Sequence, residues 1–333
     1  MLKRIYINND WYFTGDDNKK QVVSIPHTIK EIPYNYFDQK IYQITAVYEK
    51  EIELNDEIGY NLFLTFEGVG QSSQVYINDK LATTHYGGYD KFSINIKDLV
   101  TKGKNVIKVI VDASEDQNFP PFGKVIDYLC YGGIYRDVYI DVCNANYIED
   151  VFVMPIHDTS WKIKANVKLN NPTKYEASVY FKDELIEKKI VDNKDIESTV
   201  EFEFDNPMLW DLDNPNLYTL KINLLDEDSI VDTKEVTFGL RTCEFKSDGF
   251  YLNDKKVKVV GLNRHQSFPY VGYAMPKSLQ VEDARILKEE LGVNAVRTSH
   301  YMQSKYFIEA CDRLGILVFT ESPGWQYLGN EQC

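Results

Sequence analysis

Six polar side chains stand directly after three short apolar runs toward the carboxyl end of the chain. They are Asn263, Arg264 and His265 after the first run, Arg297 and His300 after the second, and Glu321 after the third. Imidazole, carboxamide and guanidinium groups hydrogen-bond to hydroxyl groups and carboxylates, and the planar donor fork of arginine suits it to orienting a carboxylate. Side chains just past the carboxyl ends of barrel strands point into the active site. The pattern therefore predicts a site at this edge.

Three short strands and two helices must position these groups. We expect strands at residues 256–261, 293–296 and 316–319, one helix capped by Ser278 and stopped by Gly292, and a second from Ser304 to Gly315. Serine before a helix and glycine after it are typical capping residues, and the apolar side chains between them recur at helical spacing. Doubly wound sheets and (β/α)₈ barrels both begin with this β-α-β-α-β order. No glycine-rich phosphate loop follows the first strand, which favours the barrel.

The preceding residues are typical of two β-sandwiches. Short alternating strands separated by Gly, Asn and Asp are expected at 60–66, 74–77, 92–96, 106–111 and 137–142. Further strands with longer connections are expected at 162–169, 178–181, 198–204 and 218–224. We interpret 1–144 as a jelly roll, 145–241 as an immunoglobulin-like sandwich without a Cys-Trp-Cys pattern, and 242–333 as the opening of a TIM barrel.

Composition excludes several classes of partner. A formal net charge of −14 disfavours nucleic acid and anionic membranes, which require clustered Lys and Arg, whereas a neutral substrate fits. The cysteines are odd in number and scattered, with no paired metal spacing, at Cys130, Cys143, Cys243, Cys311 and Cys333. The first residues lack the apolar core of a signal peptide, and no apolar run approaches the length of a membrane span. These features together predict a cytoplasmic protein.

Several motifs resemble the β-galactosidases of glycoside hydrolase family 2. In the barrel segment they are Gly261-Leu262-Asn263-Arg264-His265-Gln266, Asn294-Ala295-Val296-Arg297-Thr298-Ser299-His300-Tyr301 and Cys311-Asp312-Arg313-Leu314-Gly315-Ile316-Leu317-Val318. Earlier in the chain they are Phe66-Glu67-Gly68-Val69, His85-Tyr86-Gly87-Gly88-Tyr89 and Gly132-Gly133-Ile134-Tyr135-Arg136-Asp137-Val138. Between them, Leu209-Trp210-Asp211-Leu212-Asp213-Asn214-Pro215-Asn216-Leu217-Tyr218 and Phe238-Gly239-Leu240-Arg241 resemble segments of the family's second domain, so the resemblance covers three amino-terminal domains.

The resemblance implies roles for four residues. His265 and His300 are similar to histidines that contact sugar hydroxyls, and Arg297 to an arginine beneath the catalytic nucleophile. Asp127 matches an aspartate that the first domain directs toward the sugar. The alternative for Arg297 is an ion pair with a buried acid that braces the barrel, and the alternative for Asp127 is a solvated loop carboxylate.

A metal site and an aromatic wall are further expectations. Glu321 matches a glutamate that binds Mg²⁺ in some family members, and Mg²⁺ or Na⁺ are the candidate ions for the full-length enzyme. The residues after Glu321 lack the histidine that those members use. Trp325 could instead line the pocket, because aromatic faces stack on the C–H surfaces of sugars.

The resemblance also implies that the catalytic pair lies elsewhere. Retaining glycosidases use two carboxyl groups about 5 Å apart, and the family places them after the fourth and seventh barrel strands, beyond residue 333. We therefore expect an amino-terminal portion of a retaining β-galactosidase that is inactive alone. The alternatives are a β-glucuronidase or β-mannosidase of the same family, or a non-catalytic carbohydrate-binding module. An open third strand also favours self-association, so a homo-oligomer is among the expectations.

Overall fold

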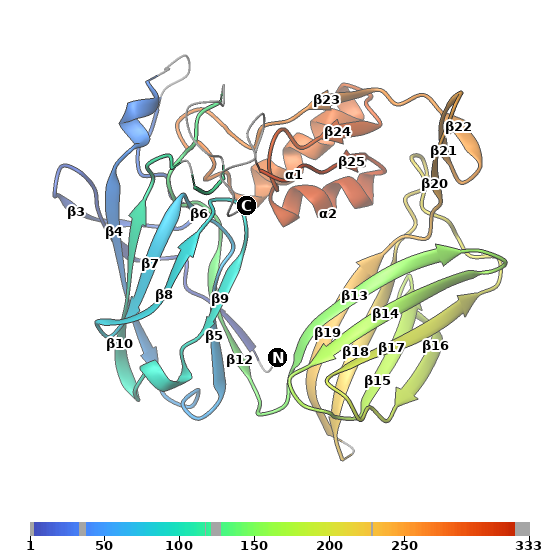
Figure 1. Ribbon diagram of the computed structural model, residues 1–333, viewed down its shortest axis with the longest axis horizontal. Helices are drawn as coiled ribbons and strands as arrows, with labels where there is room; N and C mark the ends of the chain where they lie inside the picture. The colour runs from blue at the N-terminus through green and yellow to red at the C-terminus, as the bar shows by residue number, and fades with distance from the viewer. Residues whose placement is uncertain (1–2, 33–37, 117, 121–127, 228, 324–333) are drawn as a thin grey trace.

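The computed structural model describes residues 3–32, 38–116, 118–120, 128–227 and 229–323. Two residues expected at the site, Asp127 and Trp325, lie outside these ranges. Within them the chain forms two β-sandwiches followed by a short parallel α/β segment, as the sequence predicts (Figure 1).

The first unit is an antiparallel jelly-roll sandwich. Its strands are β1 (Lys3–Tyr6), β2 (Trp11–Thr14), β3 (Lys20–Val23), β4 (Thr45–Leu54), β5 (Asn61–Phe66), β6 (Val69–Gly70), β7 (Ser72–Ile77), β8 (Lys80–Tyr86), β9 (Phe92–Asn95), β10 (Gly103–Asp112), β11 (Gly133–Ile134) and β12 (Val138–Cys143), with short 3₁₀ turns η1 (Gln39–Tyr42) and η2 (Lys97–Leu99). One sheet has the order β1-β12-β5-β9 and the other β3-β2-β4-β10-β7-β8, while β6 pairs with β11. Alternation along β10 shows why the sheets stack: Ile107, Val109 and Val111 are fully buried between them.

The second unit is an immunoglobulin-like sandwich. It contains β13 (Ile148–His157), β14 (Trp161–Leu169), β15 (Tyr175–Phe181), β16 (Glu184–Val191), β17 (Glu197–Phe204), β18 (Tyr218–Asp226) and β19 (Ser229–Phe238). The sheets have the orders β13-β14-β17 and β16-β15-β18-β19. Ile163, Val179 and Leu220 are fully buried between the two sheets.

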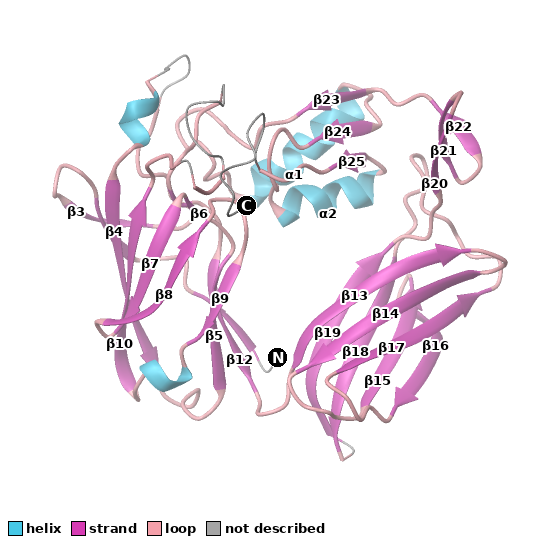
Figure 2. Cartoon of the chain, viewed as in Figure 1, coloured by secondary structure: helices cyan, strands magenta, loops and turns pink. Residues whose placement is uncertain are grey.

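The third unit begins with an antiparallel hairpin and continues as a parallel sheet. The hairpin contains β20 (Cys243–Lys246), β21 (Gly249–Leu252) and β22 (Lys255–Val257). The parallel part contains β23 (Gly261–Asn263), α1 (Lys277–Arg285), a π-helical turn η3 (Ile286–Glu290), β24 (Ala295–Arg297), α2 (Lys305–Leu314) and β25 (Leu317–Phe319). Strands pair in the order β23-β24-β25, and α1 and α2 pack together beside them (Figure 2).

Two details of the third unit differ from the sequence-based expectation. The single strand expected at 256–261 is divided between β22, which ends at Val257, and β23, which begins at Gly261. Val259 and Val260 lie in the connection between them and are partly exposed. The Asn294 side chain holds this connection by hydrogen-bonding to Lys258 O at 3.0 Å and Val260 N at 2.8 Å. Ser278 does not cap the first helix, which begins one residue earlier.

The caps of α2 are those expected. Ser304 is its N-cap and accepts a hydrogen bond from Tyr306 N, and Gly315 adopts the left-handed conformation at its end, with φ of 71°. A Cβ atom on Gly315 would lie 2.3 Å from Leu212 O of the second unit, so the helix end is also a close contact between units.

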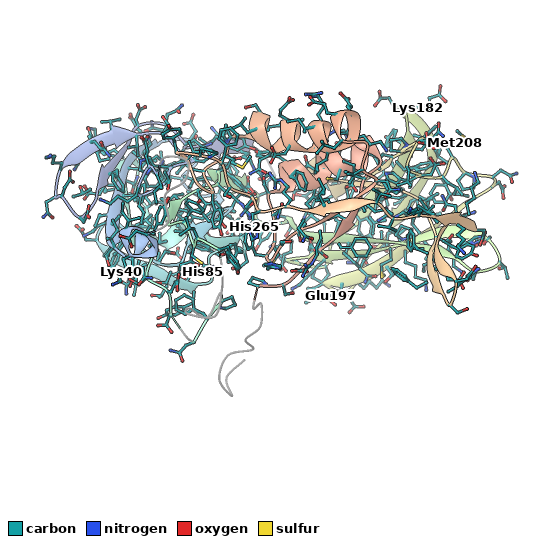
Figure 3. The ribbon with its side chains drawn as sticks, turned by 90° about the horizontal axis from the view of Figure 1, so that it is seen from above. Lys40, His85, Lys182, Glu197, Met208 and His265 are labelled. Atoms are coloured by element: carbon teal, nitrogen blue, oxygen red, sulfur yellow. The ribbon has the colours of Figure 1, made fainter. Side chains whose placement is uncertain are left out.

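The third unit lies above the two sandwiches in Figure 1, with its helices next to the jelly roll. The view from above labels His265 at the junction between the barrel segment and the jelly roll (Figure 3). In the part of the chain described, no helix combines the length and apolar character needed to cross a membrane.

Candidate functional site

The carboxyl ends of β23, β24 and β25 bring the expected site residues to one edge. Parallel pairing sets Asn263 beside Arg297 and Arg297 beside Phe319. Backbone pairing continues past the strands, because Arg264 N–H donates to Arg297 O at 2.9 Å and Thr298 N–H donates to Phe319 O. The residues that follow these strands therefore converge.

Arg297, His300 and Glu321 form a charged cluster at this edge. The Arg297 guanidinium donates through Nε to Glu321 Oε1, and His300 Nδ1 lies 2.8 Å from Glu321 Oε2. Burial raises the pKa of Glu321, but the hydrogen bonds from His300 and Arg297 outweigh it, so the pKa of this carboxyl lies below its ordinary value. Glu321 is thus an ionised acceptor. Arg297 and Glu321 are both partly exposed, so this pair is not the one with a buried acid that the sequence left as an alternative, and the role of Arg297 beneath a nucleophile stays a prediction.

His265 lies beside this cluster and contacts aromatic rings. Its ring centroid is 5.5 Å from that of His300, in an edge-to-face arrangement. Its Nδ1 atom is 3.2 Å from the Tyr301 hydroxyl oxygen. The Tyr128 ring of the jelly roll lies 5.1 Å from His265 and 5.9 Å from His300, measured between centroids. The first unit therefore supplies a wall of the site.

A group of buried tyrosines joins the jelly roll to the barrel segment behind these histidines. This tyrosine cluster contains the buried Tyr89, Tyr128, Tyr135, Tyr273 and Tyr301, with the partly buried Tyr131 packed against them. Tyr89 stacks on Tyr301 with ring centroids 4.3 Å apart and planes 11° apart. Tyr273 donates its hydroxyl proton to Leu129 O at 2.9 Å and lies 3.4 Å from the Tyr89 hydroxyl. The sequence analysis did not identify this cluster, although four of its members fall in or beside the family-like motifs.

Polar contacts fix the same junction. Arg136 of the jelly roll donates to Gln266 Oε1 and to Met302 O, both at 2.9 Å, and these acceptors belong to the barrel segment. Lys305 at the start of α2 pairs with Glu67 at 2.7 Å. The hydrogen bonds tie the histidine-bearing loops to a rigid sandwich, which limits their movement.

Arg264 does not line the site, although it follows the first barrel strand. Its guanidinium is buried over the Phe307 ring and donates to Asp283 Oδ2 at 2.6 Å and 2.9 Å, to Gln280 Oε1 and to Gln303 Oε1. Burial lowers its pKa, and Asp283 opposes that shift. Arg264 therefore braces the barrel wall between β23 and the two helices.

The described residues do not fit a magnesium site at Glu321. Both carboxylate oxygens of Glu321 contact cationic or N–H groups, from Arg297 and from His300. Mg²⁺ requires several oxygen ligands, and within 3–323, apart from the ranges not described, no three His, Cys, Asp or Glu side chains gather as ligands. No chemical step is therefore assigned to a metal here.

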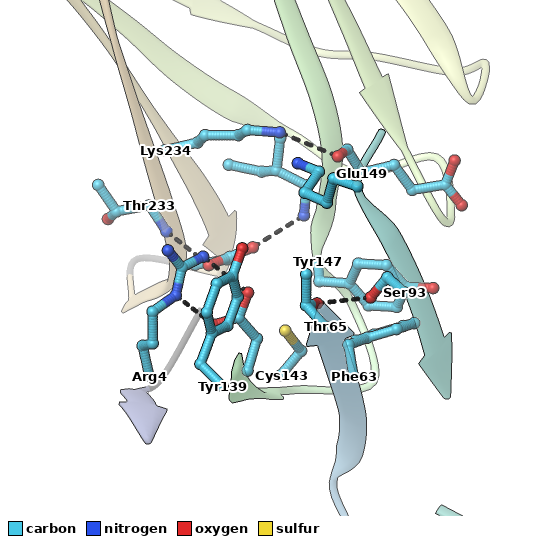
Figure 4. A pocket seen from close by; sticks show the side chains of 14 residues that line it. Arg4, Phe63, Thr65, Ser93, Tyr139, Cys143, Tyr147, Glu149, Thr233 and Lys234 are labelled. Atoms are coloured by element: carbon cyan, nitrogen blue, oxygen red, sulfur yellow. Dashed lines mark hydrogen bonds and ion pairs between the residues drawn. The ribbon is translucent and has the colours of Figure 1, made fainter. Parts of the chain in front are cut away.

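A separate cavity lies between the two sandwiches. It has a volume of about 400 Å³ and includes Arg4, Tyr139, Tyr147 and Asp232 in its lining (Figure 4). Arg4 forms two hydrogen bonds with Asp141, and Asp232 accepts from Ile148 N at 2.8 Å. Arg4 and Asp141 thus pair with each other and Asp232 accepts from backbone N–H groups, so we assign no ligand to this cavity.

Comparison with known proteins agrees with the site and the fold. Three sequence models match the chain: the sugar binding domain of glycosyl hydrolases family 2 at 5–142, glycosyl hydrolases family 2 at 146–241, and the TIM barrel domain of that family at 243–330. The chain belongs to glycosyl hydrolases family 2. This confirms the resemblance and the fold class expected from the sequence, with the opening of a barrel rather than a nucleotide-binding sheet.

Similar proteins include two enzymes about twice as long. The β-galactosidase of Thermoanaerobacterium thermosulfurigenes is 42% identical, and the match covers 100% of this chain and 50% of the relative. The β-galactosidase of Thermoanaerobacter pseudethanolicus is 38% identical, and the match covers 98% of this chain and 46% of the relative. The solved structure of Parabacteroides merdae β-glucuronidase is 26% identical, with a TM-score of 0.88 over 97% of this chain and 45% of that one. The chain thus spans about half the length of the curated relatives it matches.

Proposed function

We propose that this chain is the amino-terminal part of a retaining hydrolase of terminal β-galactosides and that it holds the substrate in place. His265 and His300 contact sugar hydroxyls, and Arg297 orients carboxylates at the edge of the site. The observation that carries this proposal is the convergence of the two histidines with the Arg297–Glu321 pair at the carboxyl ends of three parallel strands. Asp127, Trp325 and the domain limits after residues 144 and 241 remain predictions.

The catalytic acid and nucleophile are proposed to come from later barrel strands. A glycosidase acid needs a raised pKa, whereas the pKa of Glu321 is lowered by His300 and Arg297 against the effect of burial. Glu321 is therefore unsuited to donate a proton. We expect the 333-residue chain alone to be inactive, for want of the two later carboxyl groups.

A neutral sugar is favoured over a glucuronide. The cation at the described edge, Arg297, is already neutralised by Glu321 and offers no spare charge to a sugar carboxylate. The similarity to a β-glucuronidase of Bacteroides fragilis, 31% identical over 96% of this chain, keeps β-glucuronide as the second candidate. A β-mannoside and a non-catalytic module are the remaining alternatives from the sequence.

The proposed location is the cytoplasm, and a homo-oligomer stays a prediction. The four described cysteines are free, and three of them are buried, which suits a reducing compartment. Sedimentation of the purified protein at several concentrations measures its self-association.

The test measures the hydrolysis of several aryl glycosides by the whole protein of which this chain is a part. We expect turnover of nitrophenyl β-galactoside above that of the β-glucuronide and β-mannoside, and no turnover by the 333-residue chain. His300→Ala should lower kcat/KM by roughly 100-fold, because it removes a hydrogen bond at the reacting sugar. His157→Gln, on the exposed side of β13, is the control and should retain activity. Preference for the glucuronide, or an unaffected His300→Ala variant, would overturn the proposal.

A further inference from the structure

We propose that Arg136 of the jelly roll is a positioning residue for the two loops that carry His265 and His300. These are the β23 loop (264–276) and the β24 loop (298–304). The guanidinium joins one loop to the other and holds them at a fixed separation, so the first unit sets the spacing of the two histidines. The effect on activity rests on the proposed function, whereas the effect on the loops concerns the chain itself.

The barrel sheet stops short of the histidines. Main-chain pairing between β23 and β24 extends as far as the hydrogen bond from Arg264 N–H to Arg297 O, at 2.9 Å. Past this point, side chains connect the two loops. Gln303 Nε2 donates to Arg264 O, and Gln266 Oε1 accepts from Ser304 N–H at 3.2 Å. The separation of the loops therefore depends on what holds these side chains in place.

One nitrogen of Arg136 contacts both loops. Its Nη2 atom donates to Gln266 Oε1 and to Met302 O, each at 2.9 Å. Gln266 directly follows His265, and Met302 lies two residues after His300. Hydrogen bonds from a charged donor are stronger than those between neutral groups. Arg136 therefore bridges the loops more firmly than the neutral hydrogen bonds between them.

The other terminal nitrogen anchors this bridge to the jelly roll. Nη1 of Arg136 donates to Tyr89 O at 3.1 Å and to Glu67 O at 3.3 Å. The main chain here is itself paired, because Glu67 N–H donates to Asp137 O at 3.0 Å. A lysine presents a single nitrogen in place of the planar fork, so it cannot reach both sides of the junction at once. The bridge therefore requires an arginine.

The charge of Arg136 serves orientation and not an ion pair. In the described structure the four acceptors of its terminal nitrogens are uncharged oxygens, three of them main-chain carbonyls and one a side-chain amide. The neighbouring carboxylates contact other groups: Glu67 pairs with Lys305 at 2.7 Å, and Asp137 accepts from the Tyr306 hydroxyl at 2.5 Å. These acids hold the start of α2, so the guanidinium is left to the loops.

Gly68 leaves room for the Arg136 side chain. A Cβ atom on Gly68 would lie 3.0 Å from Arg136 Cδ and 2.9 Å from Tyr135 Cζ. A larger residue at this position would displace the guanidinium, so the glycine is part of the same arrangement. Gly68, Arg136 and Gln266 come from three of the segments that resemble the family. These segments therefore meet around one guanidinium.

Hydrogen exchange of the 333-residue chain, followed by NMR, tests the effect on the loops. The Tyr301 N–H donates to Thr298 O at 3.1 Å within the β24 loop, so its exchange rate reports the order of that loop. Arg136→Ala and Arg136→Lys should each accelerate this exchange about 10-fold, because both remove the bridge. Amides of β10 and β14 should keep their rates, which shows that both sandwiches remain folded. Unchanged Tyr301 exchange in Arg136→Ala, or wild-type exchange restored in Arg136→Lys, would overturn the proposal.

Tyr306→Phe is the matched control at the same junction. It removes the hydroxyl bond to Asp137 but no contact with either loop, so the Tyr301 amide should exchange at nearly the wild-type rate. Equal acceleration in Tyr306→Phe and Arg136→Ala would mean that both variants loosen the whole junction, which would overturn a specific role of Arg136.

Gln266→Leu removes an acceptor of the bridge from the barrel side. Because Arg136 acts through this acceptor, Arg136→Lys combined with Gln266→Leu should accelerate Tyr301 exchange little more than the larger single effect. This comparison does not require the alanine variant to fold. Two independent effects that multiply in the double variant would contradict the bridge.

Kinetics of the whole protein separate positioning from chemistry. Loosened loops must be ordered by the substrate, so Arg136→Lys should raise KM for nitrophenyl β-galactoside about 10-fold and change kcat by less than about threefold. Loss of a group that acts only in the transition state would lower kcat instead. Tyr306→Phe should leave both constants near their wild-type values. Faster loop exchange in a protein that does not cleave β-galactosides would overturn the proposed function alone. Normal loop exchange in the Arg136→Lys variant of an active β-galactosidase would overturn the positioning role alone.

Discussion

Replacing Asp283 by asparagine should destabilise the barrel segment, because it leaves the buried Arg264 charge without its counter-ion. The Arg264 side chain is 7% exposed and the Asp283 side chain 31%. The substitution therefore removes a partly exposed negative charge and leaves a buried positive charge. Breaking a buried ion pair from one side costs about 3–5 kcal/mol. The partial exposure of Asp283 and the remaining bonds to Gln280 and Gln303 place our expectation at the low end, about 3 kcal/mol.

Hydrogen exchange measures this change in one unit of a chain that unfolds in several steps. A loss of about 3 kcal/mol in unfolding free energy corresponds to roughly 100-fold faster hydrogen exchange. We expect this increase at the amides of α1 and β24 that exchange when the barrel segment unfolds. Amides of β14 and β18 in the second sandwich serve as the internal control and should not change. The double variant Arg264→Met, Asp283→Leu removes both charges and should recover most of the protection. Unchanged exchange in Asp283→Asn would show that the pair does not brace the wall.

Two further predictions concern backbone conformation and pH. Gly315→Ala should destabilise α2 by about 2–3 kcal/mol, because the methyl group would meet Leu212 O at 2.3 Å in addition to the cost of a positive φ. Gly292→Ala has a similar φ of 64° and no atom within 4 Å, so it should cost only about 1 kcal/mol, and equal losses in thermal unfolding would contradict this account. Burial lowers the pKa of His27 to about 4, so the unfolded chain takes up the proton first and the jelly roll should lose roughly 3 kcal/mol between about pH 6.5 and pH 4. His27→Gln should flatten this pH dependence in denaturant titrations, whereas His157→Gln should retain it.

Local patterns in the sequence predicted the barrel segment well. Ser304 and Gly315 mark the ends of α2, and the apolar runs correspond to β24 and β25 within about two residues. The strand at 256–261 was wrong because β-branched composition does not reveal pairing. Val257 completes an antiparallel hairpin, while the side chain of Asn294 ties down the exposed residues before β23.

Several strands of the sandwiches were not anticipated for a different reason. β16 carries Ile186 and Ile190 at half-exposed positions among charged residues, so it shows no simple alternation. It is a strand because its backbone pairs with β15 at the edge of the sheet. Such pairing depends on a partner strand and not on the strand's own sequence.

Contacts between residues far apart in the sequence were likewise only partly predictable at the site. Motifs at strand ends placed His265, Arg297, His300 and Glu321 on one edge, and the geometry brings them into contact. The pairing of Arg297 with Glu321 was not predicted, because the sequence does not show which acid a guanidinium meets. The tyrosine cluster could not be predicted, since its members come from units that fold around separate cores.

The tyrosine cluster has a consequence for how the three units depend on one another. Three parallel strands leave Leu262 and Phe319 about half exposed, although the helices bury a small apolar core of their own around Phe307. Tyr301 nevertheless has no exposed surface, because Tyr89 of the jelly roll covers its ring. Burial of the residue next to His300 is therefore shared between Tyr89 of the first unit and Tyr273 of the barrel segment. Substitutions in the loop that carries Tyr89 should consequently alter the histidines before they alter the fold of either sandwich.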